Sequence, residues 1–109
     1  MPIETRTIAF TGAEVAAALV DFHLRRRFPL PQGRIARITF SEPPDIRGLL
    51  SIETRHDDRP QAVTLDSEVL AAALLFYCLS RRVPLPAASQ KQLRLAGDGL
   101  ELVITTVLG

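Results

Sequence analysis

Alternation of apolar and polar residues indicates six short strands along the chain. Residues 6–10 alternate, with Ile8 and Phe10 on one side, as in a half-buried strand. The same pattern predicts strands over residues 34–40, 48–55, 62–65, 91–96 and 100–107. Most of these strands are apolar on one face only, which is typical of a largely antiparallel sheet with one face in water.

Two amphipathic helices are expected after the first and fourth strands. Thr11 and Glu14 have the spacing of an N-terminal capping box, and Asp66 is the equivalent cap of the second helix. Each helix must end before a Pro-Leu-Pro segment, because proline lacks the backbone N–H and disfavours helix in the preceding residue. The Gly-Asp-Gly at residues 97–99 predicts a hairpin turn.

The two halves of the chain resemble each other. A displacement of 55 positions aligns residues 7–31 with residues 62–86 without a gap, and ten of the 25 pairs are identical. The identities include an Arg-Arg-x-Pro-Leu-Pro segment, which occurs at residues 26–31 and 81–86. This similarity predicts an internal duplication.

The duplication defines the expected fold class and domain organisation. We predict an α+β fold made of a duplicated βαββ unit, with a mostly antiparallel sheet of about six strands and two helices packed on one face. The repeats span about residues 5–55 and 61–108 of a single domain that covers residues 1–109.

Both helices carry more apolar residues than one buried face requires. The sheet-facing stripes are expected to be Val15, Ala18, Leu19 and Phe22 in the first helix, and Leu70, Ala73, Leu74 and Tyr77 in the second. The opposite side, which is polar in an ordinary surface helix, holds the candidate interface residues Val20, Leu24, Leu75, Phe76 and Leu79.

Two explanations of this outer apolar surface stay open. The helices could pack side by side and hide it, or another protein molecule could cover it. We expect the second, in the simplest form a homodimer with a twofold axis, because Phe76 stands where the first copy has Asp21.

Arginines gather at the ends of both helices. Cations in a last turn complement the helix dipole, which explains them without any ligand. The alternative is a site for phosphate, a carboxylate ligand or a nucleic-acid backbone, formed by Arg26, Arg27, Arg81 and Arg82. The net charge of only +1 gives no support to nucleic acid as a partner, although it does not exclude one.

The sequence predicts no catalytic residue, metal site or cofactor. His23 and Cys78 occupy equivalent positions in the two copies but lack a third orienting residue or further ligands. His56, Asp57 and Asp58 are expected to form a solvated linker, because three consecutive residues rarely close a coordination sphere.

The length of the apolar stretches and the number of cysteines bear on membrane association and cellular location. The longest apolar stretch, residues 69–79, is roughly half the length that a bilayer requires, so we expect no membrane association. A single cysteine excludes an intramolecular disulfide, and we expect a cytoplasmic protein. The function that we predict is a non-enzymatic interaction or regulatory module acting as a homodimer, with anion binding as the alternative.

Overall fold

The computed structural model describes residues 1–26, 29–54 and 58–108. Within these residues the chain folds into six strands and two helices in the order βαββ-βαββ. The strands are β1 (Ile3–Phe10), β2 (Arg34–Phe40), β3 (Gly48–Glu53), β4 (Gln61–Leu65), β5 (Gln90–Ala96) and β6 (Gly99–Val107). The helices are α1 (Gly12–Arg26) and α2 (Ser67–Ser80). The α+β class expected from the sequence is confirmed.

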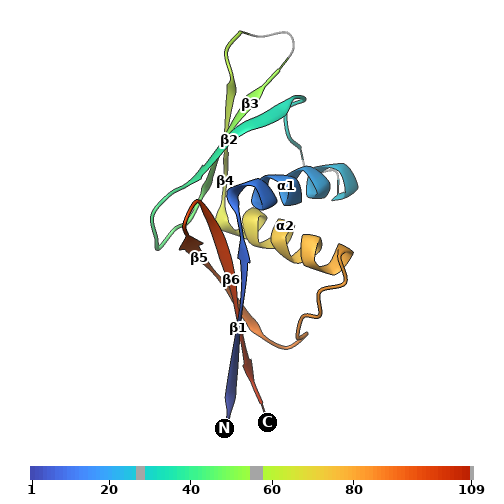
Figure 1. Ribbon diagram of the computed structural model, residues 1–109, viewed down its shortest axis with the longest axis vertical. Coiled ribbons are helices and arrows are strands. Elements are labelled where there is room, and N and C mark those ends of the chain that lie inside the picture. The colour runs from blue at the N-terminus through green and yellow to red at the C-terminus, as the bar shows by residue number, and fades with distance from the viewer. Residues whose placement is uncertain (27–28, 55–57, 109) are drawn as a thin grey trace.

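The strands form two antiparallel sheets of three rather than one continuous sheet of six. One sheet has the order β1-β6-β5 and the other β2-β3-β4. Figure 1 shows the first at the bottom and the second at the top, with both helices on the right at mid-height. The molecule is therefore elongated, measuring 56 × 28 × 18 Å. The first strand of each half pairs with the third strand of the other half: β1 pairs with β6, and β4 pairs with β3. Each sheet therefore has one strand from one half and two from the other.

Side chains at the first turn of each helix bind its free backbone N–H groups. The Glu14 N–H donates to Thr11 Oγ1 at 3.1 Å, and the Thr11 N–H donates to Glu14 Oε1 at 3.0 Å. This reciprocal pair is the predicted capping box. At the start of α2, the Val69 N–H donates to Asp66 Oδ1 at 3.0 Å, as predicted for an N-cap.

The C-terminal end of α2 closes with a left-handed residue. Arg82 has a φ of 57°, and the Val83 N–H donates to the Cys78 carbonyl at 2.9 Å. This is the Schellman arrangement, in which glycine is the usual left-handed residue. Pro84 follows at once and cannot continue the helix.

A single hydrophobic core joins both helices to the inner faces of both sheets. Its fully buried larger side chains are Val15, Leu19, Leu70, Leu74, Cys78, Ile52, Leu100, Leu102 and Ile104. The predicted sheet-facing stripes are confirmed, with Phe22 and Tyr77 partly buried at their ends. Because α1 contacts β6 of one sheet and β2 of the other, it helps to hold the two sheets together.

The predicted hairpin turn joins β5 to β6 at Gly97 and Asp98. Gly97 has a φ of 57°, which a glycine adopts without strain. Gly99 is needed for a different reason, because a Cβ at this position would overlap the carbonyl oxygen of Phe10. The glycine therefore allows β6 to approach the end of β1, where α1 begins.

We expect Gly99→Ala to lower the free energy of unfolding by about 3 kcal/mol, since the added methyl group meets backbone that cannot move aside. Gly97→Ala is the matched control, because its Cβ would meet no atom within 4 Å. It should lose only about 1 kcal/mol, the penalty of a left-handed alanine. Chemical denaturation measures both, and equal losses would contradict the close approach at Gly99.

Candidate interaction surface

The C-terminal halves of the two helices pack against each other. The rings of Phe22 and Phe76 lie edge to face, with centroids 5.9 Å apart. The guanidinium of Arg26 lies over the Phe76 ring, 4.9 Å from its centroid. Phe76 of α2 thus contacts both a ring and a cation of α1.

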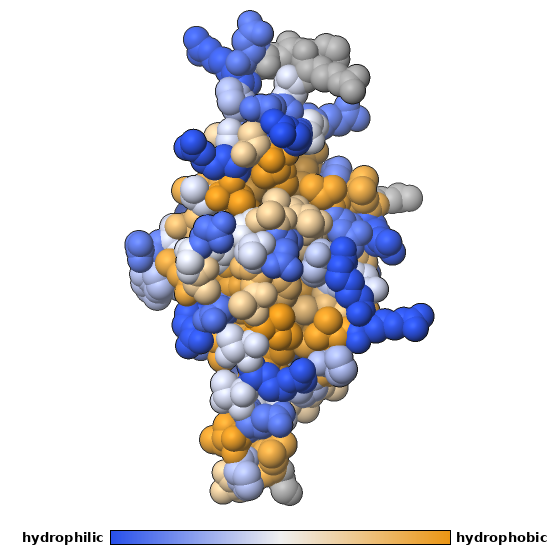
Figure 2. Space-filling view, viewed as in Figure 1, coloured by the Kyte–Doolittle hydropathy of each residue, from blue (hydrophilic) through white to orange (hydrophobic). Residues whose placement is uncertain are grey.

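This packing leaves a shallow groove with apolar walls. We call it the α2 groove; its lining residues are Phe22, Arg26, Ala72, Leu75, Phe76 and Leu79. Figure 2 shows hydrophobic side chains over the middle of the molecule, where the helices lie, with hydrophilic ones at the right, where both helices end. Among the described residues, Arg26 is the only charged one that lines the groove.

The structure brings three of the five candidate interface residues into the α2 groove. Leu75 and Phe76 are partly buried, so the contact between the helices hides part of their surface. Leu79 remains 62% exposed. Val20 and Leu24 do not line the groove, and they are 43% and 71% exposed on α1. Packing within the chain therefore explains only part of the outer apolar surface, and a contact with a second molecule stays a prediction.

The arginines at the helix ends stack on the aromatic residues of α2. Arg26 covers Phe76 as described, and the guanidinium of Arg81 lies 3.4 Å from the centroid of the Tyr77 ring. In Figure 1 both helices end on the right of the view. Arg82 is exposed beside Arg81. Arg27, the fourth residue of the predicted anion site, lies outside the described residues.

Several arginines elsewhere in the molecule form ion pairs with carboxylates, but within the described residues Arg26, Arg81 and Arg82 do not. Ion pairs join Arg25 to Asp21, Arg34 to Glu53, Arg47 to Asp45 and Arg94 to Glu101, at 2.8–3.0 Å. Over residues 1–26, 29–54 and 58–108, no carboxylate forms an ion pair with Arg26, Arg81 or Arg82. Their N–H groups therefore keep the capacity to bind an anion.

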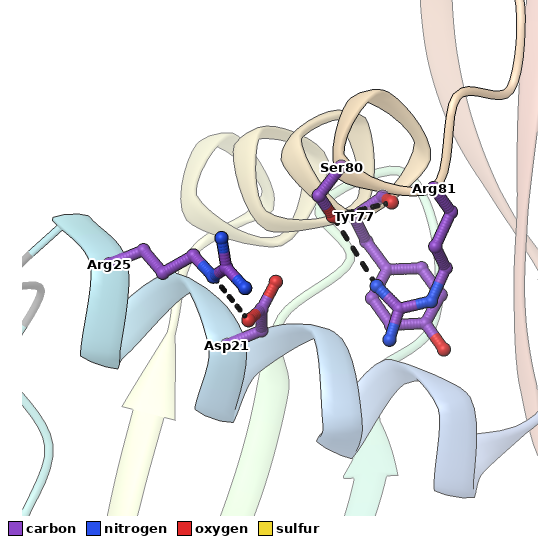
Figure 3. A network of polar contacts seen from close by, with 5 residues as sticks. All are labelled: Asp21, Arg25, Tyr77, Ser80 and Arg81. Carbon is purple, nitrogen blue, oxygen red and sulfur yellow. Dashed lines mark hydrogen bonds and ion pairs between the residues drawn. The ribbon is translucent and has the colours of Figure 1, made fainter.

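In the first half, Asp21 occupies the position equivalent to Phe76 and makes polar contacts instead, as Figure 3 shows. Asp21 Oδ1 accepts a hydrogen bond from Arg25 at 3.0 Å, while its second oxygen is buried and accepts no hydrogen bond from the described residues. On α2 the Ser80 hydroxyl donates to the Tyr77 carbonyl and accepts from Arg81 Nη1 at 3.3 Å. The same helical position thus serves apolar packing in one half and an ion pair in the other.

Candidate chemistry elsewhere is sparse. Among the residues that the structure describes, no three His, Cys, Asp or Glu side chains gather closely enough to hold a metal ion. His56 and Asp57 of the linker lie outside those residues. Cys78 is buried, and this burial raises the pKa of its thiol, an effect that the nearby Arg81 partly offsets. The thiol is therefore protonated at neutral pH and is a poor nucleophile.

Part of this surface was not expected from the sequence. Tyr77 and Arg81 are four residues apart on one helix, a spacing that brings side chains together and could have indicated their stack. The contact of Arg26 with Phe76 joins two helices, so it depends on how they cross. No local sequence signal predicts it.

Comparison with known proteins gives no assignment: no family model, no curated protein and no solved structure matches the chain. Neither helix in the described part of the chain is long and apolar enough to cross a membrane.

The buried thiol predicts a loss of stability at alkaline pH. Above the ordinary pKa of a thiol, the unfolded chain releases a proton that folded Cys78 still holds, so unfolding becomes more favourable as the pH rises. Below that pH the contribution is fully present. Denaturation of the wild type and of Cys78→Ala at neutral and alkaline pH should show a steeper alkaline loss in the wild type. Equal slopes would contradict a raised pKa for Cys78.

Proposed function

We propose that this chain is a non-enzymatic interaction module that works as a homodimer, with the α2 groove and the exposed Leu79 as its contact surface. The observation that carries this proposal is the exposure of Leu79 beside the partly buried Leu75 and Phe76, after the helices have already packed together. Exposed apolar surface next to an apolar groove is typical of contact surfaces between proteins. A cytoplasmic location belongs to the same proposal, because the free thiol of Cys78 suits a reducing compartment.

Burial of this surface would supply part of the energy that such a contact needs. Full burial of a Leu or Phe side chain contributes roughly 1.5–3 kcal/mol. Leu79 would bury most of its side chain, and Leu75 and Phe76 the remainder of theirs. A twofold axis doubles these contributions, which then counter part of the loss of translational and rotational freedom on association.

Leu79→Asp tests the contact surface with little effect on the fold, because Leu79 is 62% exposed. Placing a carboxylate there should weaken dimerisation by more than about 100-fold, since each dimer loses two buried leucines. Light scattering over a concentration series measures the dimer, and circular dichroism checks the fold. Phe76→Asp should act in the same direction but also destabilise the chain, because Phe76 packs on Phe22.

Leu49→Asp is the matched control for that experiment. Leu49 is 44% exposed on β3, so the variant adds the same charge at an apolar surface residue outside the α2 groove. It should dimerise like the wild type. A wild-type protein that stays monomeric at high concentration, or equal effects of the two variants, would refute the proposed contact surface.

Binding of an anion at the helix ends is a second candidate function. The observation that favours it is the stacking of Arg26 on Phe76 and of Arg81 on Tyr77, at helix ends where no described carboxylate pairs with either guanidinium. Stacking on Phe76 and Tyr77 holds two of the three guanidiniums in place before a ligand arrives. Because these guanidinium groups are already held in place, less side-chain conformational entropy is lost when an anion binds.

Replacement of Arg26, Arg81 and Arg82 by Gln should lower the salt concentration at which the protein leaves a heparin column. Each lost charge-assisted contact should weaken binding about tenfold. The control replaces Arg34, Arg47 and Arg94 by Gln, which changes the net charge by the same amount at ion-paired arginines. Identical elution of the two variants would show that only net charge matters and that the helix ends form no site.

A further inference from the structure

The edge strands of the two sheets differ in regularity. In each sheet only the middle strand pairs on both sides, so β1 and β5 are the edges of one sheet and β2 and β4 those of the other. The pairing of β2 with β3 shifts register between Ile35 and Arg37, and β4 has only five residues. Irregular and short edges are common means of preventing a further strand from pairing. By contrast, β5 pairs with β6 over all of its seven residues without a shift.

A cleft lies between β5 and the first turns of α2. We call it the β5 cleft, and its volume is about 310 Å³. Three consecutive residues of β5, Lys91 to Leu93, line one side, and Glu68 and Ala71 of α2 line the other. Because consecutive residues of a strand point to opposite faces, their joint presence places the cleft at the edge of β5 rather than over one face. Ile46 of the loop between β2 and β3 also lines the cleft and is buried.

The open edge of β5 retains hydrogen-bonding capacity. In an antiparallel ladder alternate residues direct their N–H and C=O groups to the neighbouring strand, and the residues between them direct theirs outward. Within the described residues β5 pairs with β6 alone, and no other backbone group bonds to residues 90–96. An extended segment of another protein can bond to these outward groups by pairing as a further strand.

Lys91, the only lysine of the chain, brings a positive charge to the β5 cleft. Its ammonium group donates to Ser89 Oγ at 2.9 Å, and the Ser89 hydroxyl donates to the Pro86 carbonyl at 2.9 Å. In the part of the chain that the structure describes, no carboxylate forms an ion pair with Lys91. The charge is therefore held in place but not neutralised, which suits an acidic residue of a ligand.

Leu93 adds a second requirement. It lies two residues from Lys91, so both side chains point to the same face of the sheet. This is the inner face, since Leu93 packs against the hydrophobic core. A strand that pairs with β5 places two of its own residues, separated by one position, opposite Lys91 and Leu93. An acidic residue opposite Lys91 and an apolar residue opposite Leu93 complement these two side chains.

We infer that the β5 cleft binds an extended segment of a partner protein in which one residue separates an acidic from an apolar residue. The segment pairs with β5 as an added strand and directs these two side chains towards α2. The first half offers no equivalent site, because Ala36 stands at the position of Lys91 and coincides with the register shift of β2. This inference goes beyond the proposed dimer, whose contact surface lies around Phe76 and Leu79.

A peptide with blocked ends and the sequence Thr-Val-Thr-Leu-Thr-Glu-Thr tests this inference. Paired antiparallel to β5, it places its Leu opposite Leu93 and its Glu opposite Lys91; the reversed sequence does so in a parallel pair. An NMR titration measures the affinity and locates the site. We expect one of the two peptides to shift the amide signals of β5, and Lys91→Gln to weaken its binding about tenfold through loss of a charge-assisted contact. Arg94→Gln is the matched control and should bind like the wild type, because Arg94 is paired with Glu101 and does not line the cleft.

Modified peptides separate strand pairing from charge attraction. A peptide with Lys in place of Glu should bind the Lys91→Glu variant better than the wild type, and N-methylation of alternate peptide amides should abolish binding. Leu79→Asp should bind the peptide unchanged, so failure of the proposed dimer and failure of the β5 cleft are distinguishable. The inference is overturned if the wild type binds neither peptide, or if Lys91→Gln and Arg94→Gln weaken binding equally. Aggregation of Lys91→Gln without peptide binding by the wild type would show instead that Lys91 protects an open edge.

Discussion

The pairing of β1 with β6 is the interaction on which the rest of the structure depends. These strands lie at opposite ends of the chain, yet they pair from Ile3 to Phe10 without interruption. Since β1 leads directly into α1, this pairing fixes where α1 begins, and the pairing of β4 with β3 does the same for α2. The crossing of the helices follows from these two starting points. The contact of Phe22 with Phe76, and with it the α2 groove, depends on that crossing.

The sequence predicts the elements well because their signals are local. Thr11 and Glu14 lie within one helical turn, and the alternation of β2 needs only seven residues. The sequence does not predict whether the first strand of each half pairs within its own half or with a strand of the other half. A strand with one apolar face, such as that bearing Ile8 and Phe10, satisfies the same pattern whether it pairs within its own half or with the other. The alternation pattern is therefore compatible both with the expected single sheet of about six strands and with the two sheets of three that the structure has.

The candidate surface was predictable to the extent that it depends on single helices. A helical wheel identifies Leu24 and Leu79 as outward-facing, and both are exposed. The wheel cannot show that Phe76 contacts both Phe22 and Arg26, since these contacts join residues 50 or more positions apart. Part of the apolar surface attributed to a partner molecule is consequently covered within the chain.

The difference between Asp21 and Phe76 bears on the kind of assembly that this chain can form. If both halves carried Phe at this position, each molecule would present two nearly equivalent apolar grooves, and contacts through both would link molecules into open chains. The ion pair of Asp21 with Arg25 places charge on one of the two sides, while Phe76 keeps the other apolar. A contact surface on one side of the molecule suits a closed twofold dimer. The nearly symmetric fold therefore carries an asymmetric surface, and the proposed contact through the α2 groove would join two molecules rather than build an open chain.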